Sequence, residues 1–337
     1  MPWQDVLCRC RPSAASDRAS SPDPIGFLPA QFTEEDVSNA IRSFPAGSAG
    51  GPDGFRPQHL RDLTSCNEKG PALLNRLTAF INLLMQGKCP PLVARILFGG
   101  RLIAIQKKSG GLRPIAIGYT FRRLAAKCVN KHAISLLRDY LAPTQLGVGV
   151  SGGCEAAVHA TRRYLDSMPD DYVVAKIDFS NAFNCIHRDS MLKAVSALMP
   201  EIYQFCYLSY HQTSLLQFGK FAIESQEGVQ QGDPLGPLLF SLTVQPLLLS
   251  LSSELTLGYL DDFTLGGALS TVTADIAKIR AEGTLIGLSL NPDKSEVVSK
   301  SGSSLHHQFT GFRQTKCESA TLLGAPIFAG SAFGGLA

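Results

Sequence analysis

The chain has 337 residues, 45% of them hydrophobic and 18% charged, and a formal net charge of +3 at pH 7. This composition is typical of a globular protein and excludes a disordered one, and the length predicts two subdomains rather than a single core. The nine cysteines form no Cys-x-x-Cys pair and no matched Cys/His set, which argues against a zinc module and favours reduced intracellular thiols.

The N-terminal segment, residues 1–29, is rich in Ser, Pro and Arg and predicts a flexible leader. It has no apolar central run, so we expect no secretory signal and predict an intracellular protein, nuclear or cytoplasmic. Thr33 and Asp36 then have the spacing of a helix-capping pair. A turn cluster at 50–54 separates this first helix from a second amphipathic helix predicted over 71–86.

A basic segment follows. From Arg76 to Arg138 the chain has twelve Lys and Arg and no Asp or Glu. Such a segment, set in an otherwise acidic chain, indicates contact with phosphates, and its alternative is a solvated charged face. Within the segment, residues 101–115 predict a β-hairpin that turns at 109–111 and carries cations on both arms. A basic helix is predicted over 121–137.

The first acidic motif comes after a glycine-rich loop at 145–153 and a helix predicted over 154–165. Residues 172–177 form a β-rich run, and Asp178 stands at its carboxyl end, where sheet proteins usually place their chemistry. Taken alone, an Asp at a strand end is more often a cap or an ion-pair partner.

A Gly/Pro-rich block, Gln231-Gly232-Asp233-Pro234-Leu235-Gly236-Pro237, follows two strands predicted over 212–226. Pro234 favours a helix start, and a helix is predicted from Asp233 to Leu251. The apolar run within it, 238–251, contains Pro246 and is too short to cross a bilayer, so no membrane partner is expected.

The last acidic motif is Asp261-Asp262, between two apolar strands that predict a tight hairpin over 257–265. Two carboxylates held together repel each other unless a cation lies between them, and Mg²⁺ prefers carboxylate oxygens. Together with Asp178 they would hold two Mg²⁺ about 3.5–4 Å apart and support in-line phosphoryl transfer. For the Asp pair alone, an acidic turn in solvent is the alternative.

These three blocks, in this order and spacing, resemble the palm motifs of reverse transcriptases of the non-LTR retrotransposon type. Asp178 with Ala182-Phe183 is similar to the first motif, 231–237 to the Gln-Gly-x-Pro-x-x-Pro box, and 259–262 to the Tyr-x-Asp-Asp box. The resemblance extends from about Phe32 to Ile327.

The resemblance implies an α+β right-hand polymerase fold, with an antiparallel palm sheet packed on helices. Its expected parts are a leader at 1–29, fingers at 30–168, a palm at 169–328 and a short C-terminal tail at 329–337. A thumb and an endonuclease domain are expected to be absent.

The resemblance also implies roles for individual residues. The expected ligands of two Mg²⁺ ions (or Mn²⁺) are Asp178, Asp261, Asp262 and the backbone carbonyl of Phe179. Lys294 is a candidate general acid for the pyrophosphate leaving group, with a surface turn lysine as its alternative. The expected nucleotide or template contacts are Lys107 and Arg113 at the phosphates, Phe183 beneath the sugar, and Gln231 with Gly232. Lys108 is a less favoured second candidate for the phosphates.

The implied reaction is RNA-templated DNA synthesis, with an RNA template, a DNA or RNA primer and dNTPs as partners. A thumb-bearing or endonuclease chain is a further expected partner. One alternative is a catalytically weak or inactive nucleic-acid-binding remnant of the same element. A second alternative, an RNA-dependent RNA polymerase, is disfavoured by Phe183, whose ring would leave no space for a 2′-hydroxyl.

Overall fold

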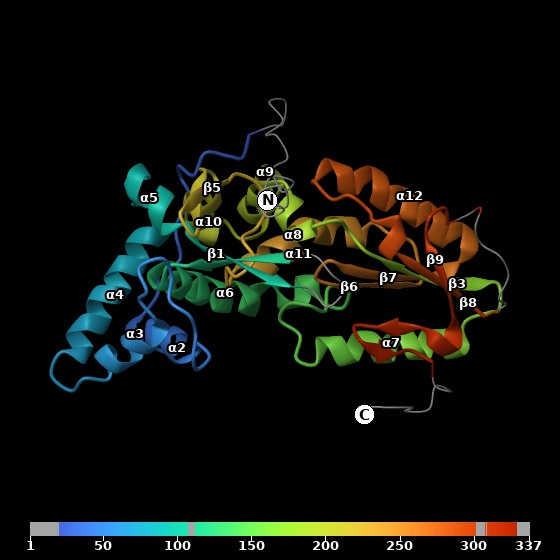
Figure 1. Ribbon diagram of the computed structural model, residues 1–337, viewed down its shortest axis with the longest axis horizontal. Coiled ribbons are helices and arrows are strands. Elements are labelled where there is room, and N and C mark those ends of the chain that lie inside the picture. The colour runs from blue at the N-terminus through green and yellow to red at the C-terminus, as the bar shows by residue number, and fades with distance from the viewer. Residues whose placement is uncertain (1–19, 107–111, 301–306, 308, 329–337) are drawn as a thin grey trace. The chain divides into compact units, whose positions relative to one another are not determined.

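The computed structural model describes residues 20–106, 112–300, 307 and 309–328. Their backbone contacts divide the chain into two compact units (Figure 1). Unit 1 takes in the described residues up to 135 together with 183–240, and unit 2 takes in 136–182 with the described residues from 241 onward. This division by contacts interleaves two parts of the chain, and the boundaries of fingers and palm that the resemblance implies stay a prediction.

Unit 1 is mostly helical. Its complete helices are α2 (Glu34–Arg42), α3 (Pro57–Thr64), α4 (Gly70–Met85), α5 (Pro91–Leu97), α9 (Arg188–Leu198) and α10 (Pro200–Tyr210). The predicted capping pair is present at the start of α2. The Thr33 hydroxyl accepts the Asp36 N–H, and the Asp36 carboxylate accepts the Thr33 N–H. Three helices extend across the division between the units: α6 (Thr120–Leu141), α8 (Ala182–Cys185) and α11 (Gly236–Leu249).

A four-stranded sheet in the order β2-β1-β4-β5 completes unit 1. The strands are β1 (Gly100–Gln106), β2 (Leu112–Gly118), β4 (Ser214–Phe218) and β5 (Phe221–Ser225). Both hairpins predicted from the sequence, β1–β2 and β4–β5, are antiparallel pairs. A short parallel contact between β1 and β4 joins them into one sheet.

The described part of the predicted leader is held against α10. The Gln204 amide donates to the Phe27 carbonyl at 2.8 Å, and the Phe27 ring packs on Tyr203 with centroids 4.7 Å apart. The Ala30 N–H donates to the Glu201 carbonyl at 2.9 Å. Helix α10 thus binds the described end of this segment, and the flexibility expected over 1–29 stays a prediction.

Unit 2 is built on a five-stranded sheet in the order β6-β7-β3-β8-β9. Every pairing is antiparallel except that of β8 with β9. The strands are β3 (Tyr172–Ile177), β6 (Leu255–Tyr259), β7 (Asp262–Ala268), β8 (Glu296–Ser299) and β9 (Arg313–Lys316). A short antiparallel pair, β10 (Thr321–Leu322) and β11 (Ala325–Pro326), follows β9 in the chain.

Helices α7 (Gly153–Ser167) and α12 (Leu269–Leu285) cover opposite faces of this sheet (Figure 1). Side chains alternate between faces along a strand. A Cβ at Gly266 of β7 would meet Tyr164 of α7, and one at Gly267 would face Val272 of α12. The sheet is thus buried between two helices, which explains the apolar character of its central strand β3. An antiparallel sheet packed on helices is the α+β architecture predicted from the sequence, which is confirmed.

Candidate active site

The Asp-Asp motif lies at the turn between β6 and β7. Tyr259 pairs with Asp262, so the turn itself consists of Leu260 and Asp261. The neighbouring strand β3 pairs with β7 up to Ile177, which lies opposite Phe263. Asp178 is therefore the next residue along β3, beside Asp262 on the adjacent strand. The sheet register brings together carboxylates that are more than eighty residues apart in the chain.

The charges of the three carboxylates act on one another. Partial burial, followed by the negative charges of Asp261 and Asp178, raises the pKa of Asp262 to about 6. Asp262 keeps an exposed side chain. Because an exposed carboxylate loses little hydration, we give the repulsion between the carboxylates more weight than burial as the cause. Lys176 opposes the shift, but its ammonium lies 2.8 Å from the Glu296 carboxylate, which also binds Arg313.

A turn after α12 fixes the backbone of Asp178. Its N–H donates to the Ser295 hydroxyl at 3.1 Å, and its carbonyl accepts the Asn291 N–H at 2.8 Å. Ser295 is fully buried and donates in turn to the Asn291 carbonyl at 2.8 Å. The sequence singled out this turn for Lys294, which lies exposed in a short 3₁₀ helix, η1 (Pro292–Lys294). The contribution of Ser295 was missed, because a single serine in a polar turn gives no sequence signal.

Phe179 is a core residue by its side chain. Its ring packs edge-to-face on Phe263 with centroids 5.1 Å apart, and its backbone forms an isolated bridge with Leu290. This packing holds the residue that follows Asp178 against the sheet. The suggested role of its backbone carbonyl as a metal ligand stays a prediction.

Oxygen ligands of this kind fit a hard divalent cation such as Mg²⁺. The mutual repulsion of the carboxylates fits it too, since a cation between them would relieve it. Among the residues that the structure describes, no three His, Cys, Asp or Glu side chains converge as a ready-made ligand set. The donor chemistry of the three carboxylates thus fits the metal.

The other predicted site residues belong to unit 1. Arg113 lies exposed on β2, opposite Ile105 of β1. Lys107 and Lys108 lie outside the described residues. The loop of Gln231 and Gly232 lies against β2, because the Ala116 N–H donates to the Gln231 carbonyl at 2.7 Å. Gly232 has a φ of 118°, and a Cβ there would lie 2.4 Å from the Ala116 carbonyl oxygen. Only glycine fits this backbone and this approach.

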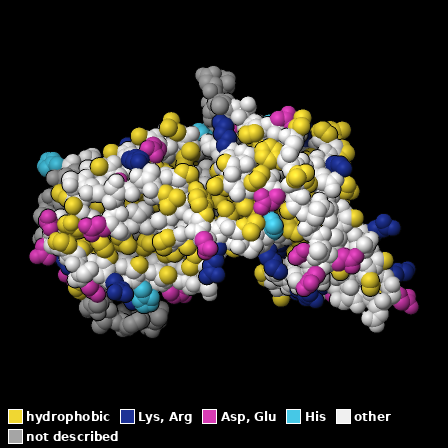
Figure 2. All heavy atoms as spheres, turned by 180° about the vertical axis from the view of Figure 1, so that it is seen from behind, with side chains coloured by type: hydrophobic (Ala, Val, Ile, Leu, Met, Phe, Trp, Pro, Cys, Tyr) yellow, Lys and Arg dark blue, Asp and Glu magenta, His cyan; other side chains and the backbone are white. Residues whose placement is uncertain are grey.

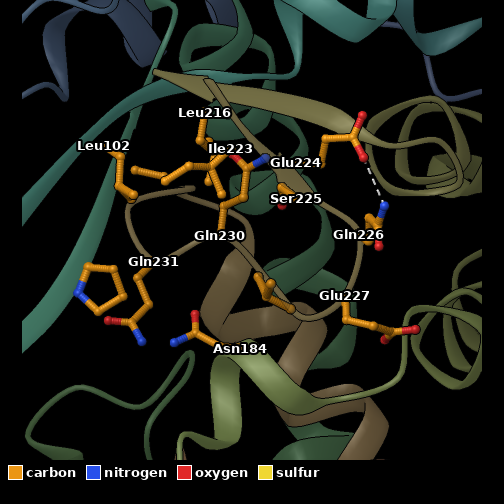
Figure 3. A pocket seen from close by; sticks show the side chains of 13 residues that line it. Leu102, Asn184, Leu216, Ile223, Glu224, Ser225, Gln226, Glu227, Gln230 and Gln231 are labelled. Atoms are coloured by element: carbon orange, nitrogen blue, oxygen red, sulfur yellow. Dashed lines mark hydrogen bonds between the residues drawn. The ribbon is translucent and has the colours of Figure 1, made fainter. Parts of the chain in front are cut away.

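Gln231 and Asn184 line a cavity of about 70 Å³ in unit 1 (Figure 3). Its apolar wall comes from the sheet, with Leu102, Leu216 and Ile223, and its polar rim from amide side chains that point toward one another. On the rim, the Gln226 amide donates to Glu224 at 3.0 Å. At Gln231 the loop thus presents a neutral hydrogen-bonding group beside an apolar surface, and the carboxylates of Glu224 and Glu227 complete the polar lining.

A buried network of charged side chains binds residues within and next to the Gln231 loop. Asp233 accepts from Arg122 at 2.8 Å and from the Tyr210 hydroxyl at 2.6 Å, and Arg122 also donates to Gln230. The Arg188 guanidinium donates to the Gly228 carbonyl at 2.9 Å. Arg122 belongs to the basic segment predicted to bind phosphates, and for this residue the prediction is wrong, because its side chain is 3% exposed and paired.

Phe183 begins the second part of unit 1, five residues after Asp178. Its ring stacks on Phe240 with centroids 4.5 Å apart, and its carbonyl accepts the Val229 N–H at 2.7 Å. The residue is half-buried, so one part of the ring is packed and another is accessible. This packing fixes the ring, and its suggested contact with a sugar stays a prediction.

The structure therefore brings together Asp178, Phe179, Asp261 and Asp262 in unit 2, with Lys294 on the adjoining turn. Arg113, Phe183, Gln231 and Gly232 lie in unit 1.

On the face drawn in Figure 2, Lys and Arg side chains lie among acidic ones. Within the described ranges, no helix is both long enough and apolar enough to cross a membrane.

Comparison with known proteins gives the chain relatives among retrotransposon proteins. It is 28% identical over 280 residues to the retrotransposable element SLACS 132 kDa protein of Trypanosoma brucei gambiense, covering 80% of this chain and 23% of that protein. It is 25% identical over 324 residues to the retrovirus-related Pol polyprotein from the type-2 retrotransposable element R2DM of Drosophila melanogaster, covering 89% and 29%. The chain thus spans less than a third of the length of these relatives.

A solved structure of telomerase from Candida albicans, in complex with a fragment of telomeric RNA, is similar with a TM-score of 0.48 at 14% identity. It covers 64% of this chain and 44% of that one. The retrotransposon relatives confirm the resemblance to the non-LTR type. Residues 105–327, well over half of the sequence, match the model of one family. With its α+β fold and its three motifs, the chain belongs to the reverse transcriptase (RNA-dependent DNA polymerase) family.

Proposed function

We propose that this chain itself catalyses RNA-templated DNA synthesis, in which a primer 3′-hydroxyl attacks the α-phosphate of a dNTP and pyrophosphate leaves. The observation that carries the proposal is the sheet register that sets Asp178 beside Asp262 at the Asp261-Asp262 turn. The raised pKa of Asp262 supports it, because it reports carboxylates close enough to repel one another.

Enzymes of this family use divalent metal ions. We assign the ligand role to Asp178, Asp261, Asp262 and the Phe179 carbonyl, with Mg²⁺ or Mn²⁺ as the ion. Two bound ions would activate the attacking hydroxyl and stabilise the charge of the in-line transfer. The protein's own contribution is to hold the three carboxylates in register. Asp262 must be ionised for this role, and a bound cation lowers the pKa of its ligands. The Mg²⁺ concentration for half-maximal rate should therefore rise as the pH falls through about 6, the pKa of that group without metal.

The remaining assignments concern the substrate. Phe183 excludes a 2′-hydroxyl by the bulk of its fixed ring and so selects dNTPs. Arg113 suits a phosphate because its planar guanidinium donates two parallel hydrogen bonds, and Lys107 supplies a second cation on the same hairpin. Gln231 hydrogen-bonds nucleotide or template from the loop that Gly232 seats on β2. Lys294 donates a proton to the pyrophosphate leaving group.

Extension of a DNA primer on an RNA template, with dNTPs and Mg²⁺, tests the proposal. The Asp261→Asn/Asp262→Asn variant should show no extension, while Asp293→Asn, which removes an exposed carboxylate from η1, should keep it. Primer–template binding without extension in the wild-type chain would favour the inactive remnant. Equal use of rNTPs and dNTPs would favour an RNA polymerase.

A second variant tests the sugar selectivity. Phe183→Val shortens the side chain and should raise incorporation of rNTPs relative to dNTPs. Phe80→Val, the same change at a half-buried ring on α4, serves as the control. An unchanged ratio in the Phe183 variant would remove that residue from the site.

A further inference from the structure

The turn that carries Asp261 has a backbone that its own residues disfavour. Leu260 has a φ of 58°, and among the described residues only Asn181 and Leu323 share a positive φ outside glycine. Two-residue hairpin turns require positive φ at their first position and normally place Gly, Asn or Asp there. A leucine brings its Cβ close to the following carbonyl in this conformation. Contacts from elsewhere in the fold must therefore hold it.

Gln145 makes those contacts. Its side-chain oxygen accepts the Leu260 N–H at 2.8 Å, and its side-chain nitrogen donates to the Leu260 carbonyl at 3.3 Å. The oxygen also accepts the Gly147 N–H at 3.1 Å. Gln145 is fully buried. One neutral amide thus binds both polar backbone groups of the residue with the disfavoured φ.

The surrounding backbone is shaped to admit this amide. Residues 144–146 run beside β6, with the Gly258 N–H donating to the Thr144 carbonyl and the Leu146 N–H to the Gly258 carbonyl, both at 2.7 Å. A Cβ at Gly258 would lie 3.0 Å from the Gln145 side-chain nitrogen, and one at Gly147 would lie 2.6 Å from the Leu260 nitrogen. The two glycines leave the space that the amide and the turn occupy.

We propose that Gln145 is a positioning residue for nucleotidyl transfer. By bonding both backbone groups of Leu260, it keeps that residue left-handed and so fixes the direction in which Asp261 and Asp262 present their carboxylates. Its neutrality matters, because a cation at this place would pair with the carboxylates and a carboxylate would add to their repulsion. The inference rests on the proposed function but is decided by different variants.

The test begins with Gln145→Met, which has similar length and no hydrogen-bonding amide. We expect a loss of about 10–100-fold in the rate of primer extension, the usual effect of removing a group that orients metal ligands. The Mg²⁺ concentration for half-maximal rate should rise, while the Kd for primer–template stays the same. If Gln145→Met does not fold, Gln145→Asn, which is too short to reach both Leu260 atoms, replaces it.

Rescue separates positioning from general stability. Adding Leu260→Gly to Gln145→Met should restore most of the lost rate, because glycine adopts positive φ without help. The control is Asp275→Asn, which replaces a buried carboxylate by a neutral amide. That carboxylate accepts hydrogen bonds from the Ser252 and Ser253 N–H groups before β6. It should lower the melting temperature without changing the Mg²⁺ dependence.

Amide hydrogen exchange provides a measurement that needs no turnover. The Leu260 amide should be protected in the wild-type chain and exposed in Gln145→Met, with the rest of β6 and β7 unchanged. Failure of Leu260→Gly to restore the rate in a folded variant, or a loss below twofold in Gln145→Met, would overturn the proposal. If the wild-type chain does not extend primers, the proposed function fails, and an unprotected Leu260 amide would then overturn the contact as well.

Discussion

The two loops that carry the candidate site are held in opposite ways. The Gln231 loop in unit 1 rests on buried charges, since Arg122, Asp233 and Tyr210 bind one another out of contact with water. The carboxylates in unit 2 are held by neutral groups: the Ser295 hydroxyl binds the backbone of Asp178, and the Gln145 amide binds the carboxylate turn at Leu260.

The difference follows from what each loop presents. The Gln231 loop presents the neutral amide of Gln231, so the buried charges that support it can pair with one another without altering the charge of that group. The carboxylate turn is itself charged, and a buried cation used as its support would neutralise it. Lys176, the cation near Asp262, is paired with Glu296. The negative charges of Asp261 and Asp178 therefore outweigh its attraction for the Asp262 carboxylate. The proposed metal site is thus supported by groups that do not neutralise its charge.

The largest expected effect comes from breaking the charged support. Arg122→Met leaves Asp233 buried without its guanidinium, and loss of one partner of a buried ion pair typically costs about 3–5 kcal/mol of unfolding free energy. Denaturant unfolding followed by circular dichroism measures this loss.

The matched control is Arg95→Met. Arg95 pairs with Glu224 at 2.9 Å, but the two side chains are 47% and 40% exposed, against 3% for both Arg122 and Asp233. Exposed pairs contribute about 0–1 kcal/mol. Equal losses in the two variants would show that the charge beneath the Gln231 loop is not a buried support.

A smaller effect is expected from the seating of the Gln231 loop on β2. Gly232→Ala places a Cβ against the Ala116 carbonyl in a backbone conformation that alanine disfavours. A strained residue of this kind costs about 1–3 kcal/mol, and the clash places this variant at the upper end. Gly219→Ala is the control, because Gly219 also has positive φ, 58°, but nothing within 4 Å of its Cβ position. If both variants unfold at the same denaturant concentration, the close contact with β2 contributes nothing.

Local patterns foretold much of the fold. The capping pair at Thr33, the strand alternation around 101–115 and the apolar runs flanking Asp261 each define an element through near neighbours, and the structure has all of them. Helix α11 begins at Gly236, three residues later than predicted, because the Asp233 side chain accepts the Leu235 N–H and holds a turn first.

What supports the site was beyond the reach of such patterns. Gln145 and Leu260 are 115 residues apart, and Asp178 and Ser295 are 117 apart, so no local rule links them. The sequence does not distinguish Arg122 from the other cations of the basic segment. Its burial and its pairing with Asp233 depend on how distant segments of the chain pack together. In the glycine-rich loop at 145–153, Gly147 lies close to the backbone of Leu260, a contact that a cluster of glycines does not by itself predict.

The smallest expected effect tests the repulsive surroundings of Asp262 through stability and pH. Its pKa is raised to about 6 in the folded chain, above that of an unfolded aspartate. Between these two values the folded state binds more protons at Asp262 than the unfolded state, so the contribution of Asp262 to stability falls as pH rises from about 4 to 6. Asp262→Asn removes this penalty, and its melting temperature should exceed that of the wild-type chain above pH 6 and converge with it near pH 4.

Mg²⁺ should raise the wild-type melting temperature above pH 6, because a ligand that binds only the folded state stabilises it, and should do less for the variant. Asp293→Asn controls for net charge. If the melting temperatures of wild type and Asp262→Asn change in parallel across this pH range, the three carboxylates do not repel one another. The carboxylate turn would then not differ from the Gln231 loop in the way described above.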